Sequence, residues 1–244
     1  MIGTTLVVVA DAHLGTAPSD ATDAFLAFLQ HVPETGDALL VNGDLFDFWF
    51  CWRHVMPRHG FHVAAALAQL RRRVPVAIVG GNHDRWGDDF WARDIGAEWH
   101  PRELRLQVGR RTALAVHGDA LTDTRPMSRA LNRVLAAPMA TTLFRRLHPD
   151  TAFRLVERIL DPMLGDEPID GPRLEASARR QLEWAEARFA AEPALGMLLM
   201  AHTHQPALHE LPGGRRYLNP GAWFDGYRYG VITDTSAELR QFTP

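Results

Sequence analysis

The chain has 244 residues, of which 46% are hydrophobic, so it can bury one substantial core, as a single domain or as a domain with an insertion. Its net charge of −3 gives no overall attraction to nucleic acid. The lone Cys51 excludes an intrachain disulfide framework, and we find neither a signal peptide nor an apolar stretch near the ~18–20 residues that span a bilayer. We therefore expect a soluble, cytoplasmic protein.

Five short apolar runs along the chain each end in residues that can bind metal ions. The runs are rich in Val, Leu, Ile and Ala, which is typical of strands buried on both faces. Residues 22–31 and 60–73 have the pattern of helices between strands, so we expect βαβ units and a largely parallel sheet. The runs precede Asp11-Ala12-His13, Gly43-Asp44-Leu45-Phe46-Asp47, Gly81-Asn82-His83-Asp84, His117-Gly118-Asp119 and His202-Thr203-His204.

The residues at the ends of these runs supply enough ligands for two metal ions. They comprise two carboxylates, one amide oxygen and four imidazoles: Asp11, His13, Asp44, Asn82, His117, His202 and His204. This set suits Mn²⁺, Fe or Zn²⁺ and is too rich in nitrogen for Ca²⁺. Two ions about 3.5–4 Å apart can activate water for in-line attack at phosphorus and offset the developing charge. Asp44, central in the set, is the expected bridging carboxylate.

Two further acids stand beside these ligands. We expect Asp84 to fix its own loop rather than to bind metal. Asp119 can either cap its turn or orient His117. The other seven histidines lie outside the motifs, and we expect them to be ordinary core or surface residues.

The pattern changes between residues 121 and 192, where the strand signals stop. Apolar residues recur there at helical spacing, around Met127–Leu135, Phe153–Met163 and Leu182–Phe189. We expect a helical cap insertion over 121–192, within a core formed by 1–120 and 193–244. Residues 207–211, 215–218 and 228–233 then predict antiparallel strands around the turn at Asn219-Pro220-Gly221. The expected fold is an α/β, two-sheet αββα sandwich with a helical cap.

The charge of the predicted cap allows two interpretations. Residues 120–160 contain seven arginines but only three acids. These helices can be an ordinary amphipathic layer on the core. Alternatively, they can meet anionic lipid headgroups while an apolar cleft receives acyl chains.

The order of the motifs resembles the calcineurin-like metallophosphoesterases, whose pattern is D-x-H, G-D-x-x-D, G-N-H-D, a lone His and H-x-H. The resemblance implies that Asp11, His13, Asp44 and His204 hold one metal ion. It implies that Asp44, Asn82, His117 and His202 hold the other. It also places His83 over the substrate, as general acid or phosphate ligand, oriented by Asp47. Both roles suit an imidazole, which titrates near neutral pH.

A narrower set of residues resembles the UDP-2,3-diacylglucosamine hydrolases of lipid A biosynthesis. It comprises residues 43–49, 117–123, 202–211 and 220–223, together with the position of the insertion. The resemblance implies Mn²⁺-dependent cleavage of a pyrophosphate to UMP and 2,3-diacylglucosamine 1-phosphate, peripherally on the cytoplasmic face of the inner membrane, with the insertion receiving the acyl chains. Asp123 matches an acid of that family and, with Arg125, is a predicted substrate-binding residue. Many members carry Arg where this chain has His83.

Three other functions remain open at this point. A soluble phosphodiesterase or pyrophosphatase acting on nucleotides or dinucleotide polyphosphates would use the same metal site. A scaffold of this fold without bound metal is disfavoured, because all seven ligands are present. A nuclease is disfavoured by the net acidity and by the lack of an extended basic track.

Overall fold

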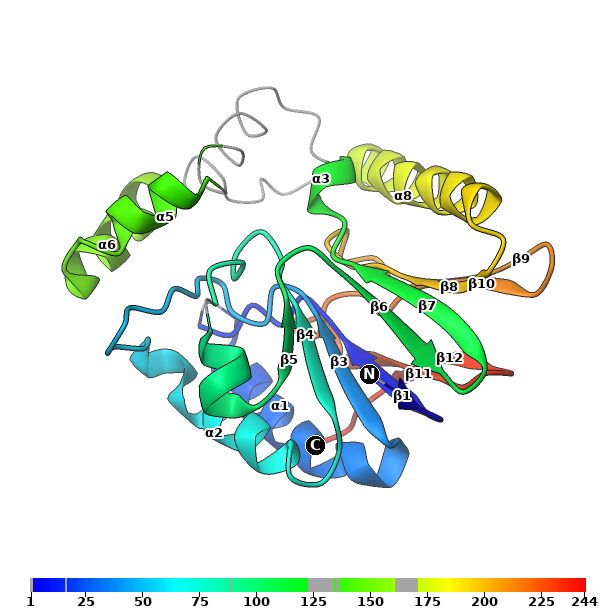
Figure 1. Ribbon diagram of the computed structural model, residues 1–244, viewed down its shortest axis with the longest axis horizontal. Coiled ribbons are helices and arrows are strands. Elements are labelled where there is room, and N and C mark those ends of the chain that lie inside the picture. The colour runs from blue at the N-terminus through cyan, green and yellow to red at the C-terminus, as the bar shows by residue number, and fades with distance from the viewer. Residues whose placement is uncertain (1, 16, 88, 123–133, 135–136, 161–170) are drawn as a thin grey trace.

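Two six-stranded sheets face each other at the centre of the protein (Figure 1). The computed structural model describes residues 2–15, 17–87, 89–122, 134, 137–160 and 171–244. The first sheet has the order β1 (Ile2–Gly3), β6 (Glu103–Val108), β7 (Arg111–Val116), β8 (Leu195–Leu199), β10 (Arg215–Asn219), β9 (Ala207–Leu211). The second has the order β12 (Ala237–Gln241), β11 (Arg228–Ile232), β2 (Leu6–Val9), β3 (Ala38–Asn42), β4 (Val76–Val79), β5 (Glu98–His100).

The register of the parallel strands brings their carboxyl ends to one edge. In the second sheet, Val9 pairs with Val41 and Asn42 pairs with Val79, so β2, β3 and β4 end at nearly the same level. In the first sheet, Ala115 of β7 pairs with Leu199 of β8. The five loops that carry the predicted ligands therefore leave the two sheets on the same side.

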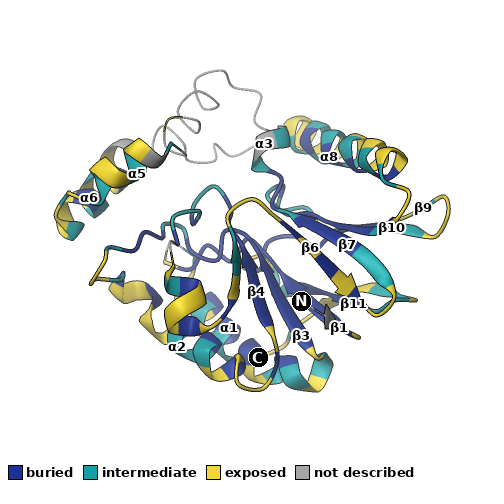
Figure 2. Ribbon diagram, in the orientation of Figure 1, coloured by how far each residue is buried: buried dark blue, intermediate teal, exposed yellow. Residues whose placement is uncertain are grey.

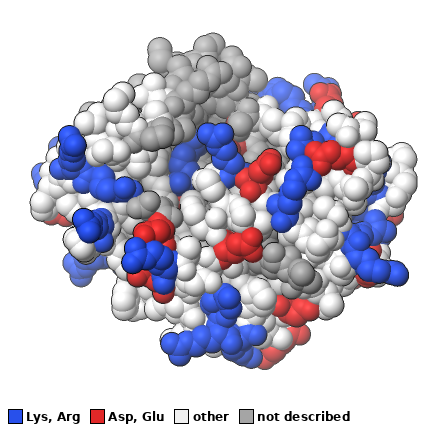
Figure 3. All heavy atoms as spheres, viewed as in Figure 1, with Lys and Arg blue, Asp and Glu red and all other residues white. Residues whose placement is uncertain are grey.

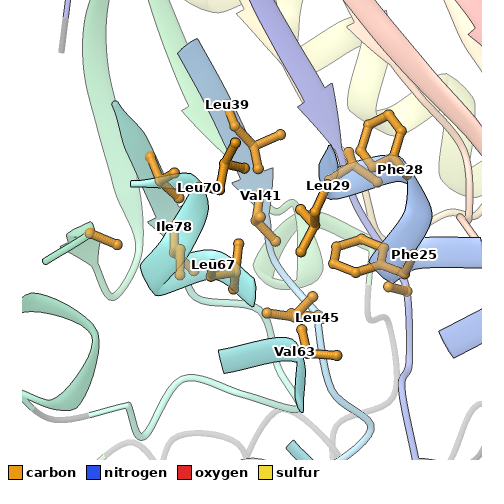
Figure 4. Close-up of a cluster of buried hydrophobic side chains, with 14 of the residues drawn as sticks. Phe25, Phe28, Leu29, Leu39, Val41, Leu45, Val63, Leu67, Leu70 and Ile78 are labelled. Atoms are coloured by element: carbon orange, nitrogen blue, oxygen red, sulfur yellow. The ribbon is translucent and has the colours of Figure 1, made fainter. Parts of the chain in front are cut away.

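Helices α1 (Ser19–Thr35) and α2 (Phe61–Leu70) cover the outer face of the second sheet, as predicted for 22–31 and 60–73. Apolar residues at helical spacing form the inner face of α1. Figure 4 shows Phe25 and Phe28 of α1 and Leu67 of α2 directed toward Val41 and Ile78 of the sheet. Burying each large apolar side chain contributes about 1.5–3 kcal/mol.

Helix α8 (Gly171–Ala191) covers the outer face of the first sheet (Figure 1). Its Ala185 and Phe189 pack against Leu114, Leu198 and Tyr217, and a separate apolar cluster fills the space between the sheets. Figure 2 shows the buried sheet faces and the exposed outer faces of the helices. These four layers confirm the predicted αββα sandwich and the helix around Leu182. The division into core and cap stays a prediction, and α8 lies within its predicted insertion.

Helix α3 (Asp119–Thr122) spans the predicted start of the insertion at residue 121. The predicted insertion continues with α5 (Pro138–Phe144), α6 (Pro149–Leu155) and a π-helical segment η3 (Val156–Leu160). Pro138 and Pro149 stand at the first position of α5 and α6, where the missing N–H is no loss. The predicted helix around Met127 falls almost entirely outside the described residues. No helix in the described ranges is both long and apolar enough to cross a bilayer.

Candidate metal centre

The predicted ligands meet at the shared edge of the sheets, in two groups. One contains Asp11, His13 and His204, and the other contains Asp44, His117 and His202. In each group the candidate ligand atoms lie within 4.8 Å of one another. Loops from both sheets thus build one cluster, as their motifs predicted.

Asp44 belongs to the second group and also approaches the first. Its Oδ2 is 3.0 Å from His117 Nε2 and 3.9 Å from His13 Nε2. Asn82 Oδ1 lies 3.2 Å from the same His117 nitrogen, which places Asn82 in the second group. Asp44 thus approaches one histidine of each group, and its role as the bridging carboxylate stays a prediction.

Burial makes the charges of the cluster energetically costly. Asp11, Asp44 and His117 are at most 1% exposed, and isolated buried charges are costly. Burial raises the pKa of Asp11 to about 7; nearby His117 opposes this rise and Asp44 adds to it. Burial would lower the pKa of His13, but the Asp47 hydrogen bond and the charges of Asp44 and Asp11 raise it to about 9.

The residues present fit divalent metal ions. Among the described residues, buried Asp11 Oδ1, His13 Nε2 and His83 Nε2 have no hydrogen-bond partner. Carboxylate oxygens and imidazole nitrogens are suitable donors for Mn²⁺, Fe or Zn²⁺. A bound cation would satisfy the ligand atoms and reduce the repulsion between Asp11 and Asp44.

Five of these residues have a left-handed backbone. The φ angles are 49° at Asp11, 45° at His13, 51° at Asp44, 70° at His202 and 57° at His204. Tyr227 is the one other non-glycine residue with positive φ in the described ranges. This conformation is uncommon outside glycine and concentrates at functional sites. Asp and His adopt it more often than most other non-glycine residues, but the motifs did not predict it at these positions.

Asn42, which the sequence analysis missed, orients His117. Its backbone oxygen lies 3.0 Å from His117 Nδ1, which leaves Nε2 directed at Asp44. The buried Asn42 amide donates to Val116 and Leu199, and so joins the two sheets. The sequence feature that could have drawn attention to Asn42 is a polar residue at the end of an otherwise apolar strand. Asn42 is therefore a candidate for orienting His117, a role that the sequence allowed for Asp119.

Asp119 instead pairs with Arg85 Nη2 at 3.2 Å. Asp84 meets the expectation that it fixes its loop. It accepts hydrogen bonds from the backbone N–H groups of Gly81, Asp44 and Leu45 at 2.8, 3.3 and 2.7 Å.

The structure places His83 beside Asp47, with the backbone of Asp47 nearer to it than the carboxylate. His83 Nδ1 lies 2.7 Å from the backbone oxygen of Asp47 and 3.9 Å from its carboxylate. That carboxylate lies 3.4 Å from Nδ1 of His13. The main chain of Asp47 therefore holds His83, while its side chain supports His13.

The aromatic residue Phe224 lies beside the cluster. The Phe224 ring lies 5.7 Å from that of His13 and 5.4 Å from that of His204, a contact that no motif indicated. Asp123 and Arg125 lie outside the described residues, so their roles stay predictions.

The model of the calcineurin-like phosphoesterase family matches residues 4–206. The chain belongs to this family. It is therefore a metal-dependent phosphoester hydrolase, and the cluster at the sheet edge is its candidate metal centre.

Relatives within the calcineurin-like phosphoesterases cover nearly the whole chain. The UDP-2,3-diacylglucosamine hydrolase of Sodalis glossinidius is 31% identical, over 96% of this chain and 97% of the relative. That of Serratia proteamaculans is 30% identical over the same shares, and that of Porphyromonas gingivalis is 25% identical over 94% of both chains. Among solved structures, Vps29 of Chaetomium thermophilum aligns over 98% of both chains at 14% identity, with a TM-score of 0.47.

Proposed function

We propose that this phosphoesterase hydrolyses the pyrophosphate of UDP-2,3-diacylglucosamine to UMP and 2,3-diacylglucosamine 1-phosphate. The full-length relatives that carry this substrate in their names support the proposal. Its main structural support is one loop that runs from the metal centre into an aromatic cluster. Asp47 holds His83, and the next residue, Phe48, contacts Phe144 and Phe153 of the insertion, with ring centroids 6.1 and 5.1 Å away.

This arrangement suits a substrate with a phosphate part and an apolar part. Phe50 and Trp52 extend the aromatic cluster, since Phe50 packs on Phe144 and Trp52 on Phe153. Trp52 also donates a hydrogen bond to the backbone of Leu147, at 3.1 Å. Acyl chains would bury apolar area against such a surface while the phosphates remain beside the ligand cluster.

The proposed chemistry assigns each side chain a task. Asp11, His13, Asp44 and His204 would hold one ion, and Asp44, Asn82, His117 and His202 the other. Two bound ions, proposed to be Mn²⁺, would supply a water nucleophile near neutral pH and offset phosphoryl charge. His83 Nδ1 lies against the Asp47 backbone oxygen, which leaves Nε2 to contact a phosphoryl oxygen or the leaving oxygen. The water oxygen would form a bond to the phosphorus nearer uridine and yield UMP. The bond from that phosphorus to the bridging oxygen would break, and this oxygen would leave as part of 2,3-diacylglucosamine 1-phosphate.

The same proposal includes contact with the cytoplasmic face of a membrane. Val134, Met139 and Leu143 are large apolar residues that are 59, 74 and 56% exposed, near Arg145 and Arg146 in the chain. Apolar side chains flanked by arginine are typical of surfaces that meet anionic lipid.

A second candidate is a soluble phosphodiesterase or pyrophosphatase for nucleotides. The observation in its favour is His83, which matches the general phosphoesterase motif where many diacylglucosamine hydrolases carry Arg. A nucleic acid substrate has less support. On the face that Figure 3 shows, basic side chains form separate groups with acidic ones between them.

The deciding experiment measures turnover by the purified protein with Mn²⁺. It compares UDP-2,3-diacylglucosamine, UDP-N-acetylglucosamine and an aryl phosphodiester. We expect strong preference for the diacyl substrate, with UMP as a product. Turnover of the two small substrates alone would refute the lipid substrate and favour the soluble phosphodiesterase.

A further inference from the structure

Gln181 is a buried polar residue in the middle of an otherwise small or apolar helix face. The inner face of α8 presents Ser177, Gln181, Ala185 and Phe189 at intervals of four residues. Gln181 is 0% exposed. A buried amide stabilises a fold only when its hydrogen bonds are made, and an apolar side chain would fill the same space at less risk. The position therefore calls for an explanation beyond packing.

Its hydrogen bonds lead to the loop that carries two predicted ligands. The side-chain N–H of Gln181 donates to the backbone oxygen of Ala201 at 2.8 Å. Its oxygen accepts from the Tyr217 hydroxyl at 2.9 Å and from the Asn219 amide at 3.4 Å. Asn219 also donates to Ala201 and to Thr203 Oγ1, at 3.2 and 3.0 Å.

These hydrogen bonds lie around His202 and His204, the two residues of the H-x-H motif that have a left-handed backbone. Ala201 and Thr203 alternate with His202 and His204, whose φ angles are 70° and 57°. Left-handed non-glycine residues persist only where surrounding contacts hold them. Bonds to Ala201 and Thr203 fix the chain on both sides of His202.

Gln181 also packs against the loop of a third predicted ligand. A Cβ on Gly118, which follows His117, would lie 2.5 Å from Gln181 Nε2, and Gly118 has a φ of +111°. The Ala201 N–H donates to the His117 backbone oxygen at 3.0 Å. Gln181 therefore contacts both loops that the first sheet contributes to the cluster.

We propose that Gln181 is a positioning residue of the metal centre, which holds His117, His202 and His204 in place for metal binding. The proposal rests on the ligand set of the proposed function. It gives α8, a helix of the predicted insertion, a direct part in the centre. Partners that orient metal ligands typically account for about 10- to 100-fold in metal affinity.

The test measures Mn²⁺ binding by the metal-free protein, through loss of the electron paramagnetic resonance signal of free Mn²⁺. Gln181→Leu removes both the donor and the acceptor at similar size. We expect its Mn²⁺ affinity to fall about 10- to 100-fold. Excess Mn²⁺ should then restore turnover of an aryl phosphodiester. Ser177→Ala, one turn earlier on the same buried face, is the matched control and should bind Mn²⁺ as the parent does.

Two further variants cover the case in which Gln181→Leu does not fold. Tyr217→Phe removes the hydroxyl that donates to Gln181 and also interacts with Asn219, and Gln181→Glu keeps the length but loses the donor to Ala201. Both should weaken Mn²⁺ binding while circular dichroism shows a folded protein. Parent affinity in every folded variant would overturn the inference and leave the proposed function standing. A parent protein that takes up no Mn²⁺ would overturn both.

Discussion

Asp44 is a buried, charged residue, and its backbone has a left-handed conformation. Its φ is 51°, and both of its carboxylate oxygens contact other site residues: Oδ1 accepts from the His83 N–H at 2.9 Å, and Oδ2 lies 3.0 Å from His117 Nε2. A left-handed backbone at such a residue costs on the order of 1–3 kcal/mol. The surrounding loop offsets this cost, because His13 N–H donates to the Asp44 backbone oxygen and Asp84 binds the Asp44 N–H.

Asp44→Asn separates the charge from the backbone conformation. Asn tolerates positive φ about as well as Asp, so the loop should keep its shape. The variant lacks the carboxylate proposed to bridge the two ions, and we expect Mn²⁺ affinity and aryl phosphodiester turnover each to fall by more than about 100-fold, the upper range for residues that only orient ligands. Calorimetry with Mn²⁺ and a turnover assay measure this. A fully active Asp44→Asn would refute the assigned centre.

At the scale of single elements, the sequence predicted most of the strands and the polar side chains that gather after them. Strands that are buried on both faces, such as β3, have an unbroken run of apolar residues, so the polar residues that follow the run are easy to recognise in the sequence. Strand β6 was missed although it alternates regularly, with Leu104, Leu106 and Val108 buried between exposed residues. A search for continuous apolar runs overlooks that period-two pattern.

The remaining parts of the site depend on tertiary contacts that no local pattern encodes. Gln181 is polar, so helical periodicity assigns it to the solvent side of α8, whereas the structure buries it completely. The preference of His83 for the Asp47 backbone over its carboxylate depends on the path of the loop. Spacing in the sequence brings residues to one loop but does not choose between their atoms.

The connection between α1 and β3 offers a test of stability against pH. The Asp37 carboxylate accepts hydrogen bonds from the Thr4 and Thr5 N–H groups, at 2.8 and 2.9 Å. Partial burial would raise its pKa, but these bonds and the Thr4 hydroxyl lower it. Because the folded-state pKa is the lower one, the stabilisation is complete above the unfolded value of about 3.9 and is lost as pH falls through the folded value.

Asp37→Asn should therefore destabilise the protein at pH 7 by about 1 kcal/mol, a modest figure because the carboxylate is exposed. Urea unfolding at pH 7 and at steps below pH 4 would measure it. The difference from the parent should shrink only below about pH 3.9. Asp23→Asn, at an exposed position of α1, is the control and should change stability little at either pH. A difference that stays constant across this range would contradict the assigned bonds.

At the scale of the whole molecule, we propose different tasks for the two sheets and for helices α5 and α6. The sheets align five loops at one edge, and those loops would carry out the phosphate chemistry, with Gln181 of α8 supporting two of them. Helices α5 and α6 meet that edge through aromatic contacts with Phe48, Phe50 and Trp52. A change in α5 or α6 should therefore alter the choice of substrate more than the ability to cleave a phosphodiester.

Phe153→Ser tests this separation. The Phe153 ring lies 5.1 Å from Phe48 and 6.2 Å from Trp52, so serine removes apolar surface close to the centre without touching a predicted ligand. Losing about 1.5–3 kcal/mol of apolar contact corresponds to roughly 10- to 150-fold. We expect kcat/KM for UDP-2,3-diacylglucosamine to fall by such a factor relative to that for an aryl phosphodiester.

The matched control is Phe61→Ser, because Phe61 is 56% exposed at the start of α2, away from the aromatic cluster. It should leave the ratio of the two kcat/KM values at that of the parent. Equal losses on both substrates in Phe153→Ser would mean that the insertion supports the metal centre as a whole. An acyl-chain surface at α6 requires the two rates to diverge, since only one substrate carries the chains that Phe153 would contact.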